Sequence, residues 1–363
     1  MTDRTHIGNA ALQPIQSLQV FRGMAAVFVL LYHVHVISNT RYGIEFANGA
    51  FNMGNIGVDF FFVLSGFIIW FVHHKDMSQP ERLPIYILKR FFRVWPLLAI
   101  LTTFKLIYIF AGPGTGINQS KSSLETIVCS YFILPVPAGQ PVLDVAWTLS
   151  HEMLFYIVIT VGILFGKRIL LLCFAVWMIT IFICIFAPNG SLSYLTSFLF
   201  SLHGLQFMIG CLAAHLVSNR LHRTSAFVST ALGLVLVGFG LYSQLDIPII
   251  HTYGLEAVFW AITFGLIIYG ACCLERIYSL SFPEFLIFPG NASYSIYLFH
   301  TSIQVPAIII MGRFGKSLNV SCQFQLWAVA LVSLLGGIVA YLLIEKPILE
   351  KSRIWTGRIL FRE

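Results

Sequence analysis

Charged residues are scarce in this sequence. Asp, Glu, Lys and Arg make up 10% of its 363 residues, 58% are hydrophobic, and the mean hydropathy is +0.83. Soluble domains carry roughly 25% charged residues. A soluble core of this size could not bury so many apolar side chains, but lipid solvates them directly. The composition therefore predicts an integral membrane protein.

Cysteine motifs are also lacking. The seven cysteines form no C-x-x-C pair, their number is odd, and most lie in apolar runs, where Cys behaves as a small hydrophobe. We expect neither a disulfide framework nor a metal site. The formal net charge of +7 lies in short loops beside apolar runs. It therefore indicates membrane orientation, and not nucleic-acid binding.

Ten apolar runs are long enough to cross the roughly 30 Å hydrocarbon core of a bilayer. The first follows residues 1–17 without a small-residue cleavage site, so we expect a retained helix and not a signal peptide. A shorter run, 124–135, predicts a re-entrant or interfacial piece, and the glycines of 112–116 predict a plain turn. The predicted fold is all-α, a polytopic bundle of about ten transmembrane helices in a single domain, 1–363. The expected spans are 18–37, 55–74, 94–111, 144–165, 169–187, 194–217, 226–243, 254–273, 291–311 and 324–344.

The basic residues predict the orientation. Lys and Arg concentrate in the cytoplasmic loops of membrane proteins. With ten spans and an N-terminus in the cytoplasm, the cytoplasmic loops and the tail 346–363 carry most of the basic residues. Both termini are therefore expected to be cytoplasmic. The opposite loops carry only Arg41, Lys121, Arg313 and Lys316.

Ionisable side chains inside apolar runs are costly and mark candidate functional sites. Arg22 and His33 are 11 residues apart in the first run. In a helix they share one face, about 16 Å apart along the axis. By rise per residue, Asp59, Glu152 and His300 reach a depth similar to that of His33. Four titratable groups at one depth predict one polar cavity.

A second group of candidates lies on the cytoplasmic side. Arg90 and Arg93 are spaced i and i+3, so they share a helical face if the third helix already includes them. Paired guanidinium groups suit phosphate, and Arg22 lies at a similar depth. Simpler interpretations stay open: the arginines could anchor the topology or snorkel, Asp59 could be a helix N-terminal charge, and the others could pair or pack internally. The histidines expected to be structural or interfacial are His35, His73, His74, His203, His215 and His251.

Six blocks of the sequence each contain at least one ionisable residue. They are Leu18-Gln19-Val20-Phe21-Arg22-Gly23 with Tyr32-His33, then Gly57 to Phe67, Arg90-Phe91-Phe92-Arg93-Val94-Trp95-Pro96, Trp147 to Tyr156, Ser293 to His300, and Glu345-Lys346-Pro347. In this order they resemble the blocks of the membrane acyltransferase 3 family, over nearly the whole chain. The first block is similar to the family's basic-x10-His signature.

This resemblance implies O-acylation of a carbohydrate, with acetyl-CoA as the donor, in the bacterial inner membrane. The chain is most similar to short members, without a fused partner domain, that act on exopolysaccharide or O-antigen of lipopolysaccharide. Membrane lipids and a lipid-linked or surface polysaccharide would be its partners. For such a reaction, the layout of the candidates leads us to expect donor binding at Arg22, Arg90, Arg93 and Lys346, and catalysis at His33, Glu152, His300 and Asp59.

His33 suits a general base, because the reference pKa of histidine is about 6.5. Glu152 or Asp59 would orient its other nitrogen, and His300 would position the acceptor or stabilise the thioester oxygen. Direct transfer and an acetyl-histidine intermediate are both open, as is a longer acyl group. Two other classes also stay open. One is a proton-coupled transporter or flippase of a glycan or glycolipid, and the other is an unrelated acyltransferase acting on lipid or protein.

Overall fold

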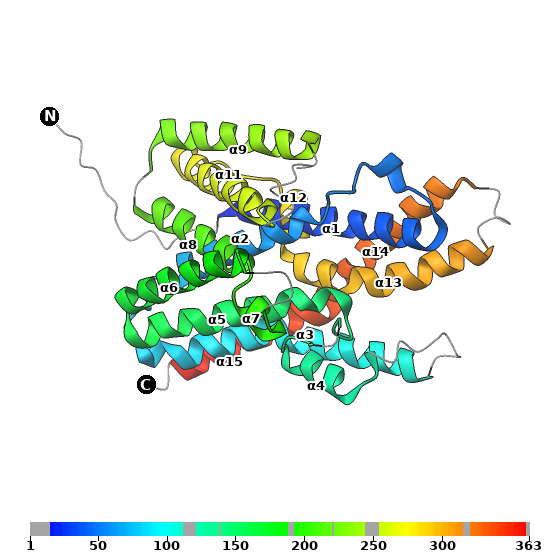
Figure 1. The fold of residues 1–363 in the computed structure, drawn as a ribbon, viewed down its shortest axis with the longest axis horizontal. Helices are drawn as coiled ribbons and strands as arrows, with labels where there is room; N and C mark the ends of the chain where they lie inside the picture. Colours follow the sequence, from blue (N-terminus) through cyan, green and yellow to red (C-terminus); the bar gives the residue numbers. More distant parts are fainter. Residues whose placement is uncertain are drawn as a thin grey trace.

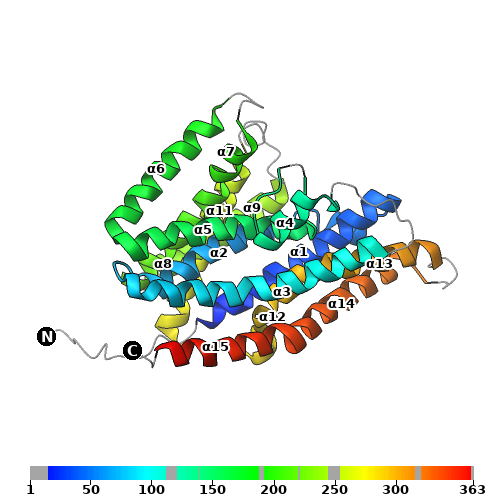
Figure 2. The ribbon, with the colours of Figure 1, turned by 90° about the horizontal axis from the view of Figure 1, so that it is seen from below.

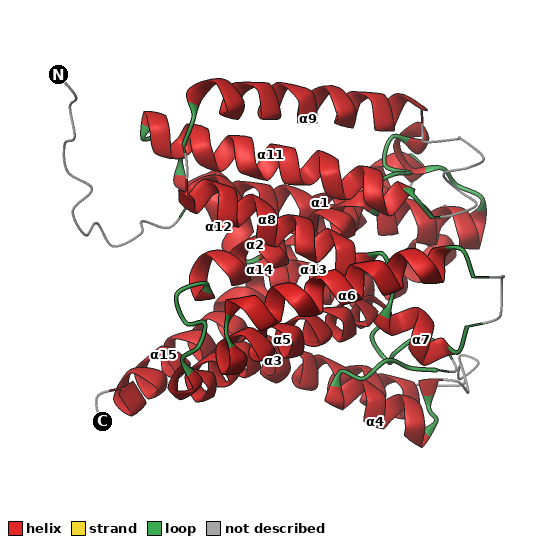
Figure 3. Ribbon diagram, turned by 60° about the vertical axis from the view of Figure 1, so that its left-hand side comes forward, coloured by secondary structure: helices red, strands yellow, loops and turns green. Residues whose placement is uncertain are grey.

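The computed structural model describes residues 15–111, 121–137, 139–187, 192–219, 221–243, 254–314 and 320–360. Within these ranges all regular secondary structure is helical (Figure 3). Ten helical segments there are long and apolar enough to cross a membrane. The predicted all-α architecture and number of spans are therefore confirmed. The stretch 112–116 and the loop residue Lys316 lie outside the described residues.

The chain folds into a series of helices (Figure 1). In chain order they are α1 (Gln16–Tyr42), η1 (Phe46–Gly49), α2 (Ile56–His73), η2 (Pro80–Arg82), α3 (Leu83–Ala111), α4 (Leu124–Phe132), η4 (Asp144–Ala146), α5 (Trp147–Phe165), α6 (Lys167–Ile185), α7 (Tyr194–Leu199), α8 (His203–Asn219), α9 (Arg223–Ser243), α11 (Glu256–Tyr278), α12 (Glu284–Asn291), α13 (Ser293–Phe314), α14 (Cys322–Ala340), the π-helical turn η6 (Tyr341–Glu345) and α15 (Lys346–Leu360).

The bundle is built around α1 and α2. α1 contacts α2, α12, α13 and α14, while α2 also contacts α5, α8 and α11. In Figure 1, α9 and α11 lie side by side along the upper edge. Figure 2 shows α3 running alongside α15, with α6 at the edge of the bundle. α6 and α9 bury the smallest share of their side chains, as expected for helices that face lipid.

Two glycines bring α2 and α8 close together. A Cβ on Gly66 would collide with the backbone of Phe207, and a Cβ on Gly210 would collide with the backbone of Val63. Small residues of this kind let the backbones of membrane helices approach each other. The contact sets the rotation of α2 and therefore the direction in which its one acidic residue, Asp59, points.

Three helix boundaries differ from the predictions. α3 begins at Leu83 and not near residue 94, so the helix already includes both of its arginines. The tenth helix does not end at Glu345-Lys346-Pro347, where the predicted span closes, because α14 continues through η6 into α15. Pro347 has no N–H to donate to the preceding turn, and it lies just after the π-helical turn, where the regular α-helical hydrogen-bond pattern is already interrupted. The sixth span is interrupted between α7 and α8, and the short run at 124–135 forms α4.

Candidate functional site

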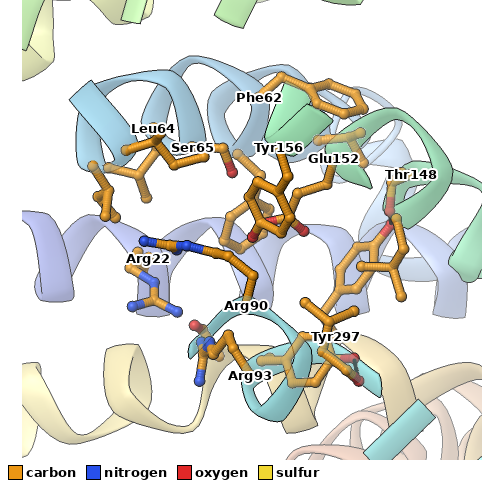
Figure 4. A pocket seen from close by; sticks show the side chains of 18 residues that line it. Arg22, Phe62, Leu64, Ser65, Arg90, Arg93, Thr148, Glu152, Tyr156 and Tyr297 are labelled. Atoms are coloured by element: carbon orange, nitrogen blue, oxygen red, sulfur yellow. Dashed lines mark hydrogen bonds between the residues drawn. The ribbon is translucent and has the colours of Figure 1, made fainter. Parts of the chain in front are cut away.

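A cavity lies between α1, α2, α3, α5 and α13 (Figure 4). The centre of a water molecule can occupy ≈ 150 Å³ of it. Apolar side chains, most of them from α2, form much of its wall, and polar side chains from all five helices complete it. We call it the arginine cavity. Its polar lining residues are Arg22, Ser65, Arg90, Arg93, Thr148, Glu152, Tyr156, Ser293, Tyr294 and Tyr297.

Three guanidinium groups gather at one side of the arginine cavity (Figure 4). Arg22 comes from α1, and Arg90 and Arg93 come from successive turns of α3. The structure thus brings together three of the four residues predicted to bind the donor. The fourth, Lys346, is exposed at the start of α15 and does not line the cavity.

Arg93 is held by a buried carboxylate. Its Nη1 forms an ion pair with Oε1 of Glu345, whose side chain is 2% exposed. The hydroxyl of Ser295 donates to the other carboxylate oxygen at 2.5 Å. The Arg93 guanidinium also lies over the ring of Tyr294, 5.3 Å from its centroid. These contacts join α3 to α13 and to the π-helical turn, a kind of turn that often marks functional sites.

Arg90 is held through a histidine and not directly by a carboxylate. Its Nη2 donates to Nε2 of His73 at 3.0 Å, and Nδ1 of His73 donates to Oδ2 of Asp76 at 2.7 Å. The guanidinium also lies over the rings of Tyr86 and Tyr156. Nε of Arg90 is buried and has no hydrogen-bond partner in the described structure. A buried donor without a partner is costly, and an anion in the cavity would satisfy it.

Arg22 has the weakest protein partner of the three. Its Nη1 lies 3.3 Å from Oε1 of Gln19, and it forms no ion pair with a carboxylate of the described chain. Among the residues that the structure describes, two carboxylates, Glu152 and Glu345, lie at the three guanidinium groups. The cavity therefore carries an excess positive charge inside a membrane helix bundle, where unbalanced charge is expensive. This charge suits an anionic ligand such as a phosphate.

Glu152 faces the arginine cavity from α5. The hydroxyl of Tyr156, one turn later, donates to Oε1 of Glu152. In Figure 4 the two side chains lie together on the wall that α5 contributes. The described hydrogen bonds do not join Glu152 to His33. The expectation that Glu152 orients the His33 imidazole therefore does not match the geometry.

His33 and His300 form a pair. Their ring centroids are 4.8 Å apart at an interplanar angle of 64°. Nδ1 of His33 donates to the carbonyl of Val29 at 2.9 Å, and Nδ1 of His300 donates to the carbonyl of Ile296 at 3.2 Å. In the neutral imidazole this leaves Nε2 as the acceptor on each ring. Backbone carbonyls of the preceding helical turns, and not carboxylates, thus orient the two histidines.

Tyr297 lies between the arginine cavity and the histidine pair. It lines the cavity, and its ring centroid is 5.9 Å from that of His300. Its hydroxyl is 3.0 Å from the hydroxyl of Thr148 and donates to the carbonyl of Val145 at 3.1 Å. Neither His33 nor His300 lines the cavity. The prediction of one cavity for all four titratable groups is therefore wrong, although the pair and the cavity are neighbours.

Asp59 lies apart from both groups. Its Oδ1 accepts a hydrogen bond from Nε2 of Gln206 in α8 at 2.5 Å. Gln206 in turn contacts His203 and the carbonyl of Ala257. Similar depth in the membrane did not bring Asp59 to His33, because the α2–α8 contact directs its side chain toward α8.

Several residues of the site were missed by sequence reasoning. Tyr156 carries a usable signal, since it is spaced i and i+4 from Glu152 on one helical face. His73 was interpreted as structural, and no local pattern shows that it holds Arg90, which lies 17 residues later. Glu345 stands 252 residues from its partner Arg93, beyond the reach of any spacing rule.

Comparison with known proteins identifies the family to which the chain belongs. Residues 15–345 match the family described as acyltransferase domain. The chain therefore belongs to this family and is an acyltransferase, which confirms the resemblance found in the six blocks. The match covers every residue of the arginine cavity and the histidine pair.

One curated protein is also similar to this chain. The exopolysaccharide production protein ExoZ of Rhizobium meliloti (strain 1021) is 30% identical over 317 residues, which cover 84% of this chain and 92% of the relative. No solved structure matches the chain significantly.

Proposed function

We propose that this acyltransferase moves an acetyl group from cytoplasmic acetyl-CoA to a hydroxyl of a cell-surface carbohydrate, an exopolysaccharide or O-antigen, in the bacterial inner membrane. The observation that carries this proposal is the arginine cavity. The charge of acetyl-CoA resides on its phosphates, and guanidinium groups bind phosphate well. The similarity to an exopolysaccharide production protein supports a carbohydrate acceptor.

The distribution of basic residues supports an orientation with both termini in the cytoplasm. In that orientation the start of α3 is cytoplasmic, and Arg90 and Arg93 lie within its first three turns. The arginine cavity then faces the compartment that supplies acetyl-CoA. The thioester at the end of the donor would point deeper into the bundle, toward Tyr297 and the histidine pair.

In the proposed reaction, His33 acts as the general base. Its Nε2 takes the proton of the acceptor hydroxyl while the hydroxyl oxygen attacks the thioester carbonyl carbon. The carbon–sulfur bond breaks, and the departing thiolate takes a proton from the imidazolium. His300 also presents an unprotonated Nε2, so it suits accepting a hydrogen bond from the carbohydrate better than stabilising the thioester oxygen. The side chain of Tyr297 has to move aside when the acetyl group passes from the arginine cavity to the histidine pair.

The test uses the purified full-length protein in nanodiscs, with radiolabelled acetyl-CoA. The acceptor is surface polysaccharide from cells that lack this protein and is therefore unacylated. The expected result is alkali-labile label on the polysaccharide. Label on lipid or protein only, or no label at all, would overturn the proposal. Movement of a glycan across a vesicle membrane without acylation would favour a transporter instead.

A further inference from the structure

A second cavity lies on the other side of α5 from the arginine cavity. Trp147 and His151 of α5 line it, together with Tyr194 and Phe198 of α7. The loop before η4 closes it with residues 134–136, 139 and 141. The centre of a water molecule can occupy ≈ 70 Å³ of it. Three aromatic side chains and one imidazole thus surround a space that the proposed chemistry does not use.

The two cavities share α5 as their wall. Phe62 of α2 lines the arginine cavity, and its ring lies 5.9 Å from His151 and 6.3 Å from Trp147, both in the second cavity. One layer of side chains therefore separates the two spaces. Along α5, the residues that line the arginine cavity are Thr148, Leu149, Glu152 and Tyr156, and those that line the second cavity are Trp147, Ser150 and His151.

A buried polar chain leads from Asp59 to the second cavity. Gln206 is fully buried, and its Nε2 donates to Asp59 at 2.5 Å and to the carbonyl of Ala257 at 3.2 Å. Its Oε1 therefore faces His203, whose Nδ1 donates to it at 3.1 Å. The His203 ring then packs against His151, with centroids 4.9 Å apart. So many polar groups inside membrane helices are expensive and mark a functional site.

His151 ends this chain at the second cavity. Its side chain is only 7% exposed, and Nδ1 lies 3.5 Å from the hydroxyl of Ser201. Nε2 has no hydrogen-bond partner among the described residues. Phe198 stacks on one face of the imidazole at 4.4 Å. The ring is thus held in place with one nitrogen open to a ligand.

We propose that the second cavity is a carbohydrate subsite, which binds a sugar unit of the acceptor other than the unit that is acylated. This inference rests on the proposed function. A sugar ring carries C–H groups on its faces, which pack on aromatic rings, and hydroxyls at its edge, which bond to an imidazole nitrogen. A lipid chain would leave Nε2 of His151 without a polar partner. The reacting unit would lie on the far side of α5, where the histidine pair is.

The test compares Tyr194→Ala and His151→Gln with the control Leu195→Ala. Tyr194 and Leu195 are neighbours on α7, 45% and 56% exposed, but only Tyr194 lines the second cavity. Calorimetry measures the binding of fragments, of one to six sugar units, cut from the unacylated surface polysaccharide. We expect Tyr194→Ala and His151→Gln to weaken binding of the longer fragments by roughly tenfold, about 1.4 kcal/mol. Leu195→Ala should bind as the native protein does.

Transfer assays separate the two proposals. The same variants should raise the KM for long fragments, with the KM for acetyl-CoA and the rate with single sugar units unchanged. Native transfer with unaltered fragment binding in Tyr194→Ala would overturn the subsite and leave the function standing. Fragment binding that depends on Tyr194, without any transfer by the native protein, would overturn the function and keep the subsite. Tyr194→Ala is decisive if His151→Gln does not fold.

Discussion

Arg93 of α3 and Glu345 of the π-helical turn form an ion pair, buried on the glutamate side, between residues 252 positions apart in the chain. The pair holds the last of the six sequence blocks, Glu345-Lys346-Pro347, next to the third, which begins at Arg90. It also fixes one wall of the arginine cavity, because Arg93 lines that cavity while Glu345 is 2% exposed.

Breaking this pair should destabilise the protein. Glu345→Gln leaves the Arg93 charge without its counter-ion, and hydrogen bonds to charged groups are worth about 1.5–3 kcal/mol. Arg93→Gln together with Glu345→Gln should cost less than the sum of the two single changes, because the double variant leaves no unpaired charge. Thermal unfolding in detergent measures the three variants. Additive losses would contradict a direct pairing.

Removing a cavity arginine should weaken donor binding. We expect Arg22→Gln or Arg90→Gln to raise the KM for acetyl-CoA by roughly tenfold or more, since each removes a charged hydrogen-bond donor. Acetyl-pantetheine, which lacks the phosphates, should be used equally well by the native protein and both variants. Lys346→Gln is the control and should behave as the native protein does, because Lys346 is exposed outside the cavity. Equal losses with both donors would contradict phosphate binding.

His73 should act through Arg90. His73→Leu removes the acceptor at 3.0 Å from Arg90 and keeps an apolar side chain of similar size. The expected result is a several-fold higher KM for acetyl-CoA with kcat unchanged. His74→Leu, next in the chain and bonded only to backbone carbonyls, is the control. A fall in kcat without a change in the KM of the donor would exclude this positioning role.

His33 should be essential for transfer. We expect His33→Gln to lower kcat by about 10²–10⁴-fold, the usual contribution of a general base. His35→Gln, two residues later on α1 and buried in a different direction, should keep most of the activity. Membrane abundance is measured for both by immunoblot. An active His33→Gln protein would rule out His33 both as base and as nucleophile.

Tyr297 should limit the size of the transferred group. Tyr297→Ala opens the wall between the arginine cavity and the histidine pair. The ratio of butyryl to acetyl transfer should therefore rise. Tyr297→Phe keeps the ring and loses the bonds to Thr148 and Val145, so its ratio should stay close to the native one. An unchanged ratio in Tyr297→Ala would show that the acyl group takes another path.

The sequence predicted the helices well because length and apolar composition alone decide whether a segment can span a bilayer. The sequence also predicted that Arg22, Arg90 and Arg93 lie at a similar depth. The depth of a residue follows from the rise per residue of its helix, and the orientation of the helix follows from the basic loops. Depth does not define the direction in which a side chain points around its helix. Asp59 therefore faces Gln206 and not His33, because the glycine contacts of α2 with α8 set its rotation.

Contacts between residues far apart in the chain could not be predicted from the sequence either. The Arg93–Glu345 pair depends on how α3 and η6 pack. The surroundings of His151 depend on a short helix, α7, which a break separates from α8 in the sixth span. Such contacts follow only from the packing of the whole bundle, because the periodicity within one helix says nothing about which residues of another helix it meets.

The shared wall of α5 has a consequence for genetics. Successive residues of a helix point about 100° apart, so the codons between 147 and 156 encode residues of both cavities in a mixed order. A saturation screen should find alleles defective in coenzyme use interleaved along the gene with alleles defective in glycan selection. Plotted on a helical wheel, the two sets should separate into opposite sectors.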